Sequence, residues 1–287
     1  MPGSALLVDQ TPRYGGGGAI WGSLERRPPA TARYPARVDS QAWRVILHEV
    51  VDSTNERALA SLAAGEARDG DVHVAAAQTA GRGRRGARWE SAAGEGLYAS
   101  AVLLPSPPAP PAPAVTMMAG LAVLDALRAL GLEGARLKWP NDVLVQDAKL
   151  AGILVETRGL DPAAPHFVVG IGVNVAQRAF PPELERERAV TSLAREGLSK
   201  SVEEVLAKLL AALPERWLQA RERPAELARD YLHAADLARR RVRVSLGEKP
   251  IEGRVRSLDV ARGLTLEGAS GPPRVLALEH IRAVEAI

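Results

Sequence analysis

The chain has 287 residues and a formal net charge of +3 at pH 7, with 46% hydrophobic and 25% charged residues. This balance is that of an ordinary globular protein, and the length allows one large domain and a small one. The sequence contains no cysteine, which excludes disulfides, thiolate metal sites and cysteine nucleophiles within it. The small net charge does not by itself predict nucleic-acid binding.

Residues 1–42 are rich in Gly, Pro and Arg and show no sustained hydrophobic period, so we expect a disordered or loosely docked extension. They lack the pattern of a secretory signal. No apolar run approaches the roughly 20 residues that a membrane helix needs. The apolar helix predicted over residues 114–130 is interrupted by Gly120, Asp125 and Arg128. These features predict a cytoplasmic protein without membrane attachment.

Residues 43–235 mix strand and helix patterns. The helix predicted after residue 52 begins with Ser53 and Glu56, which have the spacing of a capping box, and Ser201 and Glu204 repeat that spacing before a later helix. Strand patterns that follow one another closely predict antiparallel neighbours joined by short loops. The predicted strands are 43–50, 71–78, 96–105, 135–145, 149–159 and 166–175.

Residues 236–287 consist of short β-rich runs separated by glycine turns, which is typical of a small β-barrel. The whole chain therefore predicts an α+β protein with a mixed, largely antiparallel sheet and flanking helices. We expect a larger domain at 43–235 and the barrel at 236–287, sizes that are common for domains.

The segment QTAGRGRRGARWES, residues 78–91, is the most unusual in the chain. Gly81, Gly83 and Gly86 have the spacing of a dinucleotide-binding fingerprint, but neither the required helix nor the acidic residue follows. The Gly-Lys-Ser/Thr of a phosphate-binding Walker loop is also missing. The ordinary alternative is a solvated basic hairpin tip. Alternating glycines and arginines can instead direct backbone N–H groups and guanidinium groups at one anion, which favours a loop for a small phosphorylated ligand.

Three other segments carry polar residues among apolar ones. In DSTN, residues 52–55, simple N-capping is an alternative explanation for Ser53. VVGIGVNV embeds Asn174 in a strand, where an unpaired amide would cost about 1–3 kcal/mol. The third segment, KWPNDVLVQDAKLAGILVE, contributes Lys138, Asn141, Asp142 and Lys149. Each segment has a structural explanation on its own, but their combination favours a binding site.

In this order, the four motifs resemble those of the biotin protein ligases, from about residue 45 to the C-terminus. The resemblance implies a class II synthetase-like catalytic domain followed by a small SH3-like β-barrel. It implies an ATP-to-AMP-forming carbon–nitrogen ligase that makes biotinyl-AMP and transfers biotin to a lysine of a biotin carboxyl carrier protein domain. ATP and biotin would be its substrates, with Mg²⁺ assisting.

The resemblance also assigns roles to individual residues. It implies that Lys149, Arg84 and Asp142 are catalytic, with Asp142 orienting and helping to deprotonate the acceptor amine. No metal ligands can be assigned. The residues expected to bind biotin are Ser53, Thr54, Asn55, Gln78, Gly81, Arg82, Gly83, Arg84 and Lys149. Those expected to bind ATP or the adenylate are Arg82, Arg84, Arg85, Trp89, Asn141 and Asn174.

Some relatives of this family carry an N-terminal DNA-binding domain of about 60 residues, which residues 1–42 are too short to form. We therefore expect a ligase that does not bind DNA. The resemblance is also compatible with a homodimer. Two alternatives stay open. One is a ligase for lipoate or another acyl group on the same fold, and the other is a non-enzymatic basic protein that regulates or binds nucleic acid.

Overall fold

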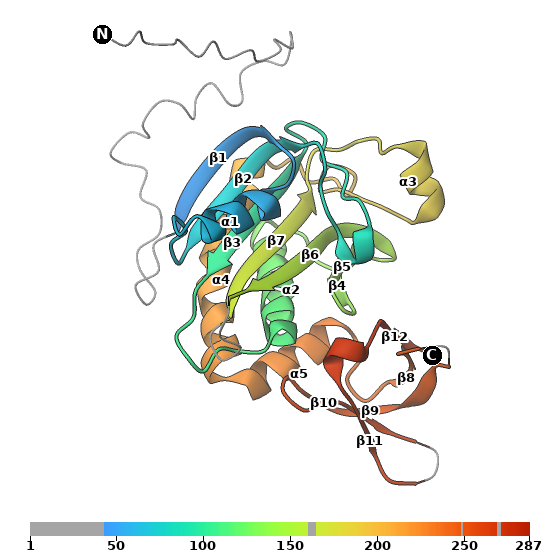
Figure 1. Ribbon diagram of the computed structural model, residues 1–287. Helices are drawn as coiled ribbons and strands as arrows, with labels where there is room; N and C mark the ends of the chain where they lie inside the picture. The colour runs from blue at the N-terminus through green and yellow to red at the C-terminus, as the bar shows by residue number, and fades with distance from the viewer. Residues whose placement is uncertain (1–42, 160–164, 248, 269–270) are drawn as a thin grey trace, which may run out of the picture. The chain divides into compact units, whose positions relative to one another are not determined.

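The computed structural model describes residues 43–159, 165–247, 249–268 and 271–287. The expectation for residues 1–42 lies outside these described residues. The larger sheet has the strand order β1-β2-β3-β7-β6-β5-β4 (Figure 1). Its strands are β1 (Arg44–Val51), β2 (Asp71–Gln78), β3 (Gly96–Leu103), β4 (Ala135–Lys138), β5 (Asp142–Val145), β6 (Ala148–Arg158) and β7 (His166–Asn174).

Only β1 and β2 run parallel in this sheet, and every other neighbouring pair is antiparallel. The predicted mixed, largely antiparallel sheet is therefore confirmed. The run at 135–145, predicted as one strand, forms the two strands β4 and β5. Pro140 lies between them after a cis peptide bond. Proline has no N–H to give to a sheet ladder, so the strand ends there and the chain turns.

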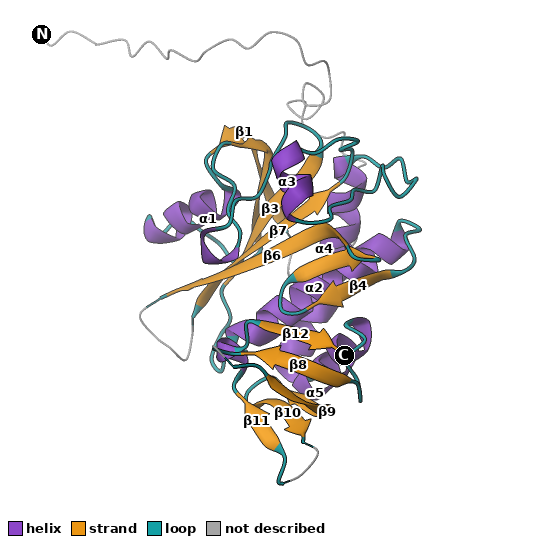
Figure 2. Ribbon diagram, turned by 90° about the vertical axis from the view of Figure 1, so that its right-hand side faces the viewer, coloured by secondary structure: helices purple, strands orange, loops and turns teal. Residues whose placement is uncertain are grey.

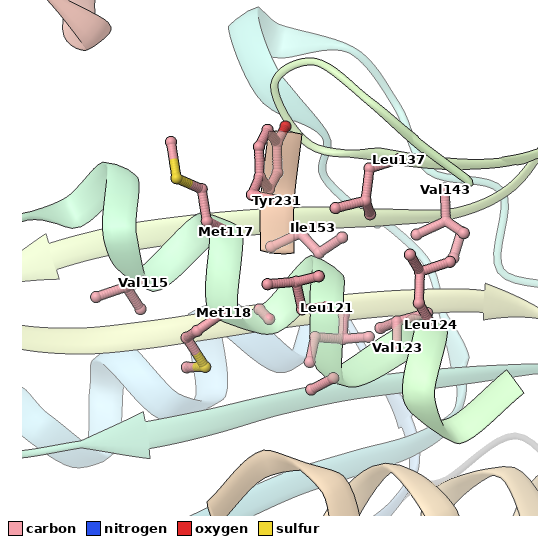
Figure 3. Close-up of a cluster of buried hydrophobic side chains, with 14 of the residues drawn as sticks. Val115, Met117, Met118, Leu121, Val123, Leu124, Leu137, Val143, Ile153 and Tyr231 are labelled. Atoms are coloured by element: carbon pink, nitrogen blue, oxygen red, sulfur yellow. The ribbon is translucent and has the colours of Figure 1, made fainter. Parts of the chain in front are cut away.

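Helices cover both faces of the larger sheet (Figure 2). The first helix packs on β2, β3 and β7, whereas the second packs on β4 to β7 and on the fourth helix. The main hydrophobic core lies on this second face, and Figure 3 shows part of it around Met118, Leu121 and Ile153. The helices are α1 (Thr54–Ala63), α2 (Ala112–Ala129), α3 (Pro182–Glu187), α4 (Val202–Glu222) and α5 (Pro224–Ala234).

Helix α2 is long and apolar enough to cross a membrane by length and composition alone. Most of its residues are buried against the sheet and α4, as expected for the central helix of a core. Its apolar character is therefore explained by packing within the protein.

The two predicted capping boxes have different outcomes. Ser201 accepts a hydrogen bond from the Glu204 amide and the Glu204 carboxylate accepts one from the Ser201 amide, so this box is confirmed. Ser53 is the N-cap of α1, but its side chain makes no capping bond. Glu56 forms an ion pair with Arg82 instead. Because the partner of Glu56 comes from a distant loop, the local spacing could not reveal it.

The C-terminal residues form an antiparallel sheet in the order β11-β10-β9-β8-β12. Among the described residues no pairing joins β11 to β12, so the sheet is open and the predicted closed barrel is not established. The sheet packs on α5 and shares the main core. Its strands are β8 (Arg241–Ser245), β9 (Ile251–Asp259), β10 (Gly263–Glu267), β11 (Arg274–Leu276) and β12 (Ala283–Ala286).

A buried histidine makes the stability of the fold depend on pH. His73 of β2 stacks on His48 of β1, with 3.1 Å between Nε2 of His48 and Nδ1 of His73. Burial, and then the charge of His48, lower the pKa of His73 from 6.5 to about 4; Asp71 opposes this shift, and Arg44 and Arg57 add to it. The unfolded state therefore binds more protons than the folded state between these two pH values.

We expect the free energy of unfolding to fall as the pH is lowered from about 6.5 towards 4, and to fall less steeply in a His73→Leu variant. Above pH 6.5 the ring is neutral in both states and contributes no slope. Urea denaturation of both proteins at a series of pH values measures this difference. Identical pH slopes would contradict the assignment.

Candidate active site

A cavity of about 200 Å³ lies on the α1 side of the larger sheet, over β6 and β7. Side chains of α1, β2, β5, β6, β7 and the loop between β2 and β3 meet there. Most of the residues predicted from the motifs line it, although they are spread over nearly 100 positions of the sequence. The predicted residues that line this cavity are Ser53, Thr54, Asn55, Gln78, Arg82, Gly83, Arg84, Trp89, Asn141, Asp142 and Lys149.

The glycine–arginine segment forms a compact hairpin, residues 81–89, that leads from β2 towards β3. Its arms are joined by main-chain hydrogen bonds from Trp89 to Gly81, 2.9 Å, and from Gly83 to Ala87, 2.7 Å. Arg85 and Gly86 turn the chain at the tip with φ values of 57° and 77°, a region that suits glycine. The Gly83 amide is therefore used within the hairpin. We call this segment the Gly–Arg hairpin.

One end of the cavity is built from side-chain amides and hydroxyls. Gln78 accepts hydrogen bonds from the Thr54 amide at 2.8 Å and its hydroxyl at 3.2 Å, and donates to Ser91 at 2.8 Å. Ser100 lies 2.7 Å from the Thr54 hydroxyl and donates to Asn55 Oδ1 at 2.6 Å. Buried groups held in this way present fixed donors and acceptors to a polar, uncharged ligand.

Glycines on β6 and β7 make room for these side chains. A Cβ atom on Gly170 would lie 2.3 Å from Asn55 Oδ1, and one on Gly172 would lie 2.5 Å from the Trp89 ring. Residues two apart on a strand point to the same face and lie about 6.7 Å from each other. The amide end near Gly170 and the Trp89 ring near Gly172 are therefore successive parts of one cavity floor.

Replacing Gly170 by alanine is expected to weaken the binding of biotin, the ligand that the motifs predict, about fivefold or more, because displacing the buried Asn55 amide costs at least 1 kcal/mol. The control is Gly247→Ala, where an added Cβ meets nothing within 4 Å. Calorimetric titration with biotin measures the affinity and a thermal melt checks the fold. Equal biotin affinities in the two variants would show that Asn55 does not shape the ligand site.

The other end of the cavity holds a buried lysine. The Lys149 ammonium lies 2.6 Å from Asp142 Oδ1 and 5.4 Å from the centre of the Trp89 ring, and its side chain is only 14% exposed. Its main chain is pinned by hydrogen bonds with Ala189 and Thr191. The ammonium group is therefore held rigidly at a cavity wall, where low exposure strengthens its interaction with an anion.

Arg84 extends from the Gly–Arg hairpin into the same end of the cavity. Its guanidinium lies 3.5 Å from Asn141 Oδ1, at the limit of a hydrogen bond. Within the described part of the chain, no carboxylate forms an ion pair with it. Burial, and then the charge of Arg85, lower the pKa of Arg84 below its ordinary value. Arginine stays charged at neutral pH, so Arg84 is a half-buried cation that an anionic ligand can neutralise.

Arg82 is placed differently from Arg84. Its guanidinium lies between Glu56, at 2.6 Å, and Glu156, so carboxylates of the protein already offset its charge. The predicted contact of Arg82 with a substrate anion stays a prediction. Among the described residues that line the cavity, Arg84 is the cation without a carboxylate partner.

Three predicted residues do not line the cavity. Gly81 is buried at the base of the hairpin, where a Cβ would lie 2.5 Å from the Trp89 carbonyl oxygen. Arg85 faces a groove beside the C-terminal sheet. Asn174 is buried and donates to the Thr191 carbonyl oxygen at 2.8 Å, so its amide is paired with the main chain. It supports the segment that pins Lys149.

Sequence reasoning did not identify several residues of the site. Ser100 is fully buried in the otherwise apolar strand β3, and a hydroxyl in such a run is a signal that it has a polar partner. Gly170 and Gly172 have the alternating spacing that clears one face of a strand. Glu156 is the last residue of the KLAGILVE run and lies within β6, but no role was predicted for it. Arg88 and Arg188 also line the cavity.

Known proteins with similar sequences identify the class of protein to which this chain belongs. The model of the biotin/lipoate A/B protein ligase family matches residues 47–174. A bifunctional ligase/repressor of Salmonella typhimurium is 34% identical over 234 residues, covering 80% of this chain and 72% of the relative. A biotin–[acetyl-CoA-carboxylase] ligase of Mycobacterium tuberculosis is 38% identical over 221 residues, covering 75% and 80% of the two chains.

The structural comparison agrees. The biotin protein ligase of Aquifex aeolicus in complex with biotin and ATP superposes with a TM-score of 0.70 at 30% identity. The match covers 85% of this chain and 99% of that one. The chain belongs to the biotin protein ligase family and is a ligase.

Proposed function

We propose that this protein activates biotin with ATP to form biotinyl-AMP and then transfers the biotinyl group to a lysine of a biotin carboxyl carrier protein domain. The observation that carries the proposal is the polarity of one cavity. A neutral amide and hydroxyl end, at Thr54 and Gln78, suits the ureido ring of biotin. A cationic end, at Arg84 and Lys149, suits a carboxylate meeting a phosphate.

In the first step the biotin carboxylate attacks the α-phosphate of ATP and pyrophosphate leaves. Both reactants are anions, so the site must offset their repulsion and stabilise the charge of the transition state. Lys149 is held at this position by Asp142 and by its pinned main chain. Arg84 reaches the same end from the Gly–Arg hairpin, so it contacts the phosphate and encloses the adenylate. Asn141 and Trp89 border the nucleotide, and Asn174 supports Lys149 from behind.

In the second step a neutral lysine amine of the carrier attacks the mixed anhydride and AMP leaves. Asp142 is the carboxylate of the cavity that borders the reacting end, so it orients this amine and accepts its proton. Mg²⁺ would be held by the ATP phosphates. No group of three or more His, Cys, Asp or Glu among the described residues forms a dedicated metal site.

The proposal extends to the rest of the chain. The open C-terminal sheet is an SH3-like module, since five short antiparallel strands are typical of such modules. The absence of cysteine suits a cytoplasmic location. The small net charge of +3 gives no support for DNA binding. A homodimer is consistent with β1, an edge strand that exposes Leu47 and Val50.

Biotinylation of a purified carrier domain tests the proposed reaction. The protein, ATP, Mg²⁺ and biotin are incubated with the domain and with a variant whose acceptor lysine is arginine. We expect the mass of the unmodified domain to rise by one biotinyl group and that of the variant to stay unchanged. An unmodified wild-type carrier, together with tight and steeply salt-dependent DNA binding, would favour the non-enzymatic alternative instead.

A further inference from the structure

The Gly–Arg hairpin is fastened to the body of the protein by a pair of carboxylates. Arg82 Nη1 lies 2.6 Å from Glu56 of α1, and Nη2 contacts Glu156 of β6. The Glu156 side chain is only 18% exposed, and Glu56 is 41% exposed. A charged hydrogen bond to a partly buried carboxylate is stronger than an exposed ion pair. Glu156 is therefore the stronger of the two anchors.

Glu156 also connects the hairpin to the amide end of the cavity. Its Oε2 atom accepts a hydrogen bond from Asn55 Nδ2 at 2.8 Å. Asn55 is joined to Ser100, Thr54 and Gln78 by the bonds described above. Gln78 donates to Ser91, whose hydroxyl donates to the Trp89 carbonyl oxygen at 3.3 Å.

This chain of contacts starts on one arm of the hairpin, at Arg82, and returns to the other arm, at Trp89. It passes through the residues proposed to bind the ureido ring of biotin. A hydrogen-bonded network of this kind transmits a change at one member to the others. The position of the hairpin and the shape of the amide end are therefore set together.

We propose that Glu156 is a positioning residue, assisted by Glu56, that locks the Gly–Arg hairpin over the cavity and aligns Asn55 for the ligand. In this role Arg82 fastens the hairpin and leaves anion binding to Arg84, which has no carboxylate partner among the described residues. The effect on the ligand rests on the proposed biotin ligase activity. The effect on the hairpin itself does not.

Limited trypsin digestion without any ligand tests the lock directly, because the hairpin carries Arg84 and Arg85 as cleavage sites. Cleavage of a briefly opened segment reports the population of the open form. Glu156→Gln keeps an oxygen acceptor for Asn55 but removes the charge that holds Arg82. We expect cleavage after residues 84 and 85, followed by mass spectrometry, to be about fivefold faster than in the wild type.

The matched control is Glu252→Gln. Glu252 also joins two arginines, Arg241 and Arg243, but it lies on the C-terminal sheet. This variant should leave hairpin cleavage unchanged, and thermal melts check that both variants are folded. A Glu156→Gln protein that is cut no faster than the control would overturn the proposal.

A double-mutant cycle with Arg82→Met distinguishes loss of the contact between Arg82 and Glu156 from a general loosening of the fold. Arg82→Met alone should speed cleavage at least as much as Glu156→Gln. Adding Glu156→Gln to it should cause no further increase, because the shared contact is already gone. Equal increases from Glu156→Gln in both backgrounds would mean that the two residues act independently, against the proposal.

The proposal also predicts that KM and kcat respond differently in the biotin-dependent exchange of pyrophosphate into ATP. Glu156→Gln should raise KM for biotin about fivefold and leave kcat within about twofold, because the lock aligns the ligand and does not touch reacting atoms. An unchanged KM for biotin would contradict the proposal that Glu156 aligns Asn55 for the ligand. If the wild type shows no biotin-dependent exchange, the proposed function fails, while the trypsin result still decides whether the lock exists.

Discussion

Replacing Lys149 by alanine is expected to lower the rate of adenylate formation by about 100-fold to 1000-fold, the range found when a preorganised charge is removed from a reaction centre. The physical reason is twofold. The variant loses the ammonium that would stabilise the reacting carboxylate and phosphate. It also leaves Asp142, now 2.6 Å from Lys149 Nζ, without its counter-charge at the same place.

The measurement is pyrophosphate release in a single turnover with biotin and ATP. Lys138→Ala is the control, because Lys138 is an exposed lysine of β4 outside the cavity lining and should keep the full rate. A thermal melt of both variants shows whether the fold persists. Full pyrophosphate release by the Lys149→Ala protein would remove this residue from the mechanism.

Replacing Arg84 by glycine is expected to weaken the retention of biotinyl-AMP about 10-fold to 100-fold, as for the loss of a charged hydrogen bond. Arg84 is the cation of the hairpin that extends into the cavity without a carboxylate partner among the described residues. Released adenylate reacts with any lysine it meets. The variant should therefore biotinylate unrelated proteins that the wild type leaves unmodified.

Arg85→Gly is a closely matched control, with the same substitution at the next residue and the same change of charge. Arg85 has a φ of 57° and lies outside the cavity lining, so glycine fits its backbone and the cavity keeps all its lining side chains. An Arg84→Met variant separates loss of charge from added flexibility. Trapping the adenylate after filtration gives its lifetime, and an unchanged lifetime in Arg84→Gly would contradict the enclosing role.

The sequence predicted the main sheet and most of the cavity because these depend on short, local patterns. Short apolar runs predict β2, β3 and β7, and the motifs bring Thr54, Gln78 and Lys149 to one cavity once those strands are paired. The Ser201 capping box is local in the same way. Such features are set within a few residues of chain, so a single sequence reveals them.

The features that escaped prediction depend on distant partners. The contact of Arg82 with a ligand stays a prediction, but its ion pair with Glu156, which lies 74 positions away, was not predicted. The nucleotide contact of Asn174 stays a prediction, but its hydrogen bond to the Thr191 carbonyl oxygen was not predicted, because another segment of chain supplies that oxygen. Strand patterns at the C-terminus predicted the strands, but closure of a barrel depends on which edges meet, and spacing along the chain does not specify this.

The most direct test of the central claim is biotin-dependent exchange of labelled pyrophosphate into ATP, measured with the purified protein and with lipoate as the comparison substrate. The cavity, with a neutral amide end and Arg84 and Lys149 at the other, predicts rapid exchange with biotin, none without an added acid, and at most weak exchange with lipoate. Exchange that is faster with lipoate than with biotin, or absent with both, would contradict it.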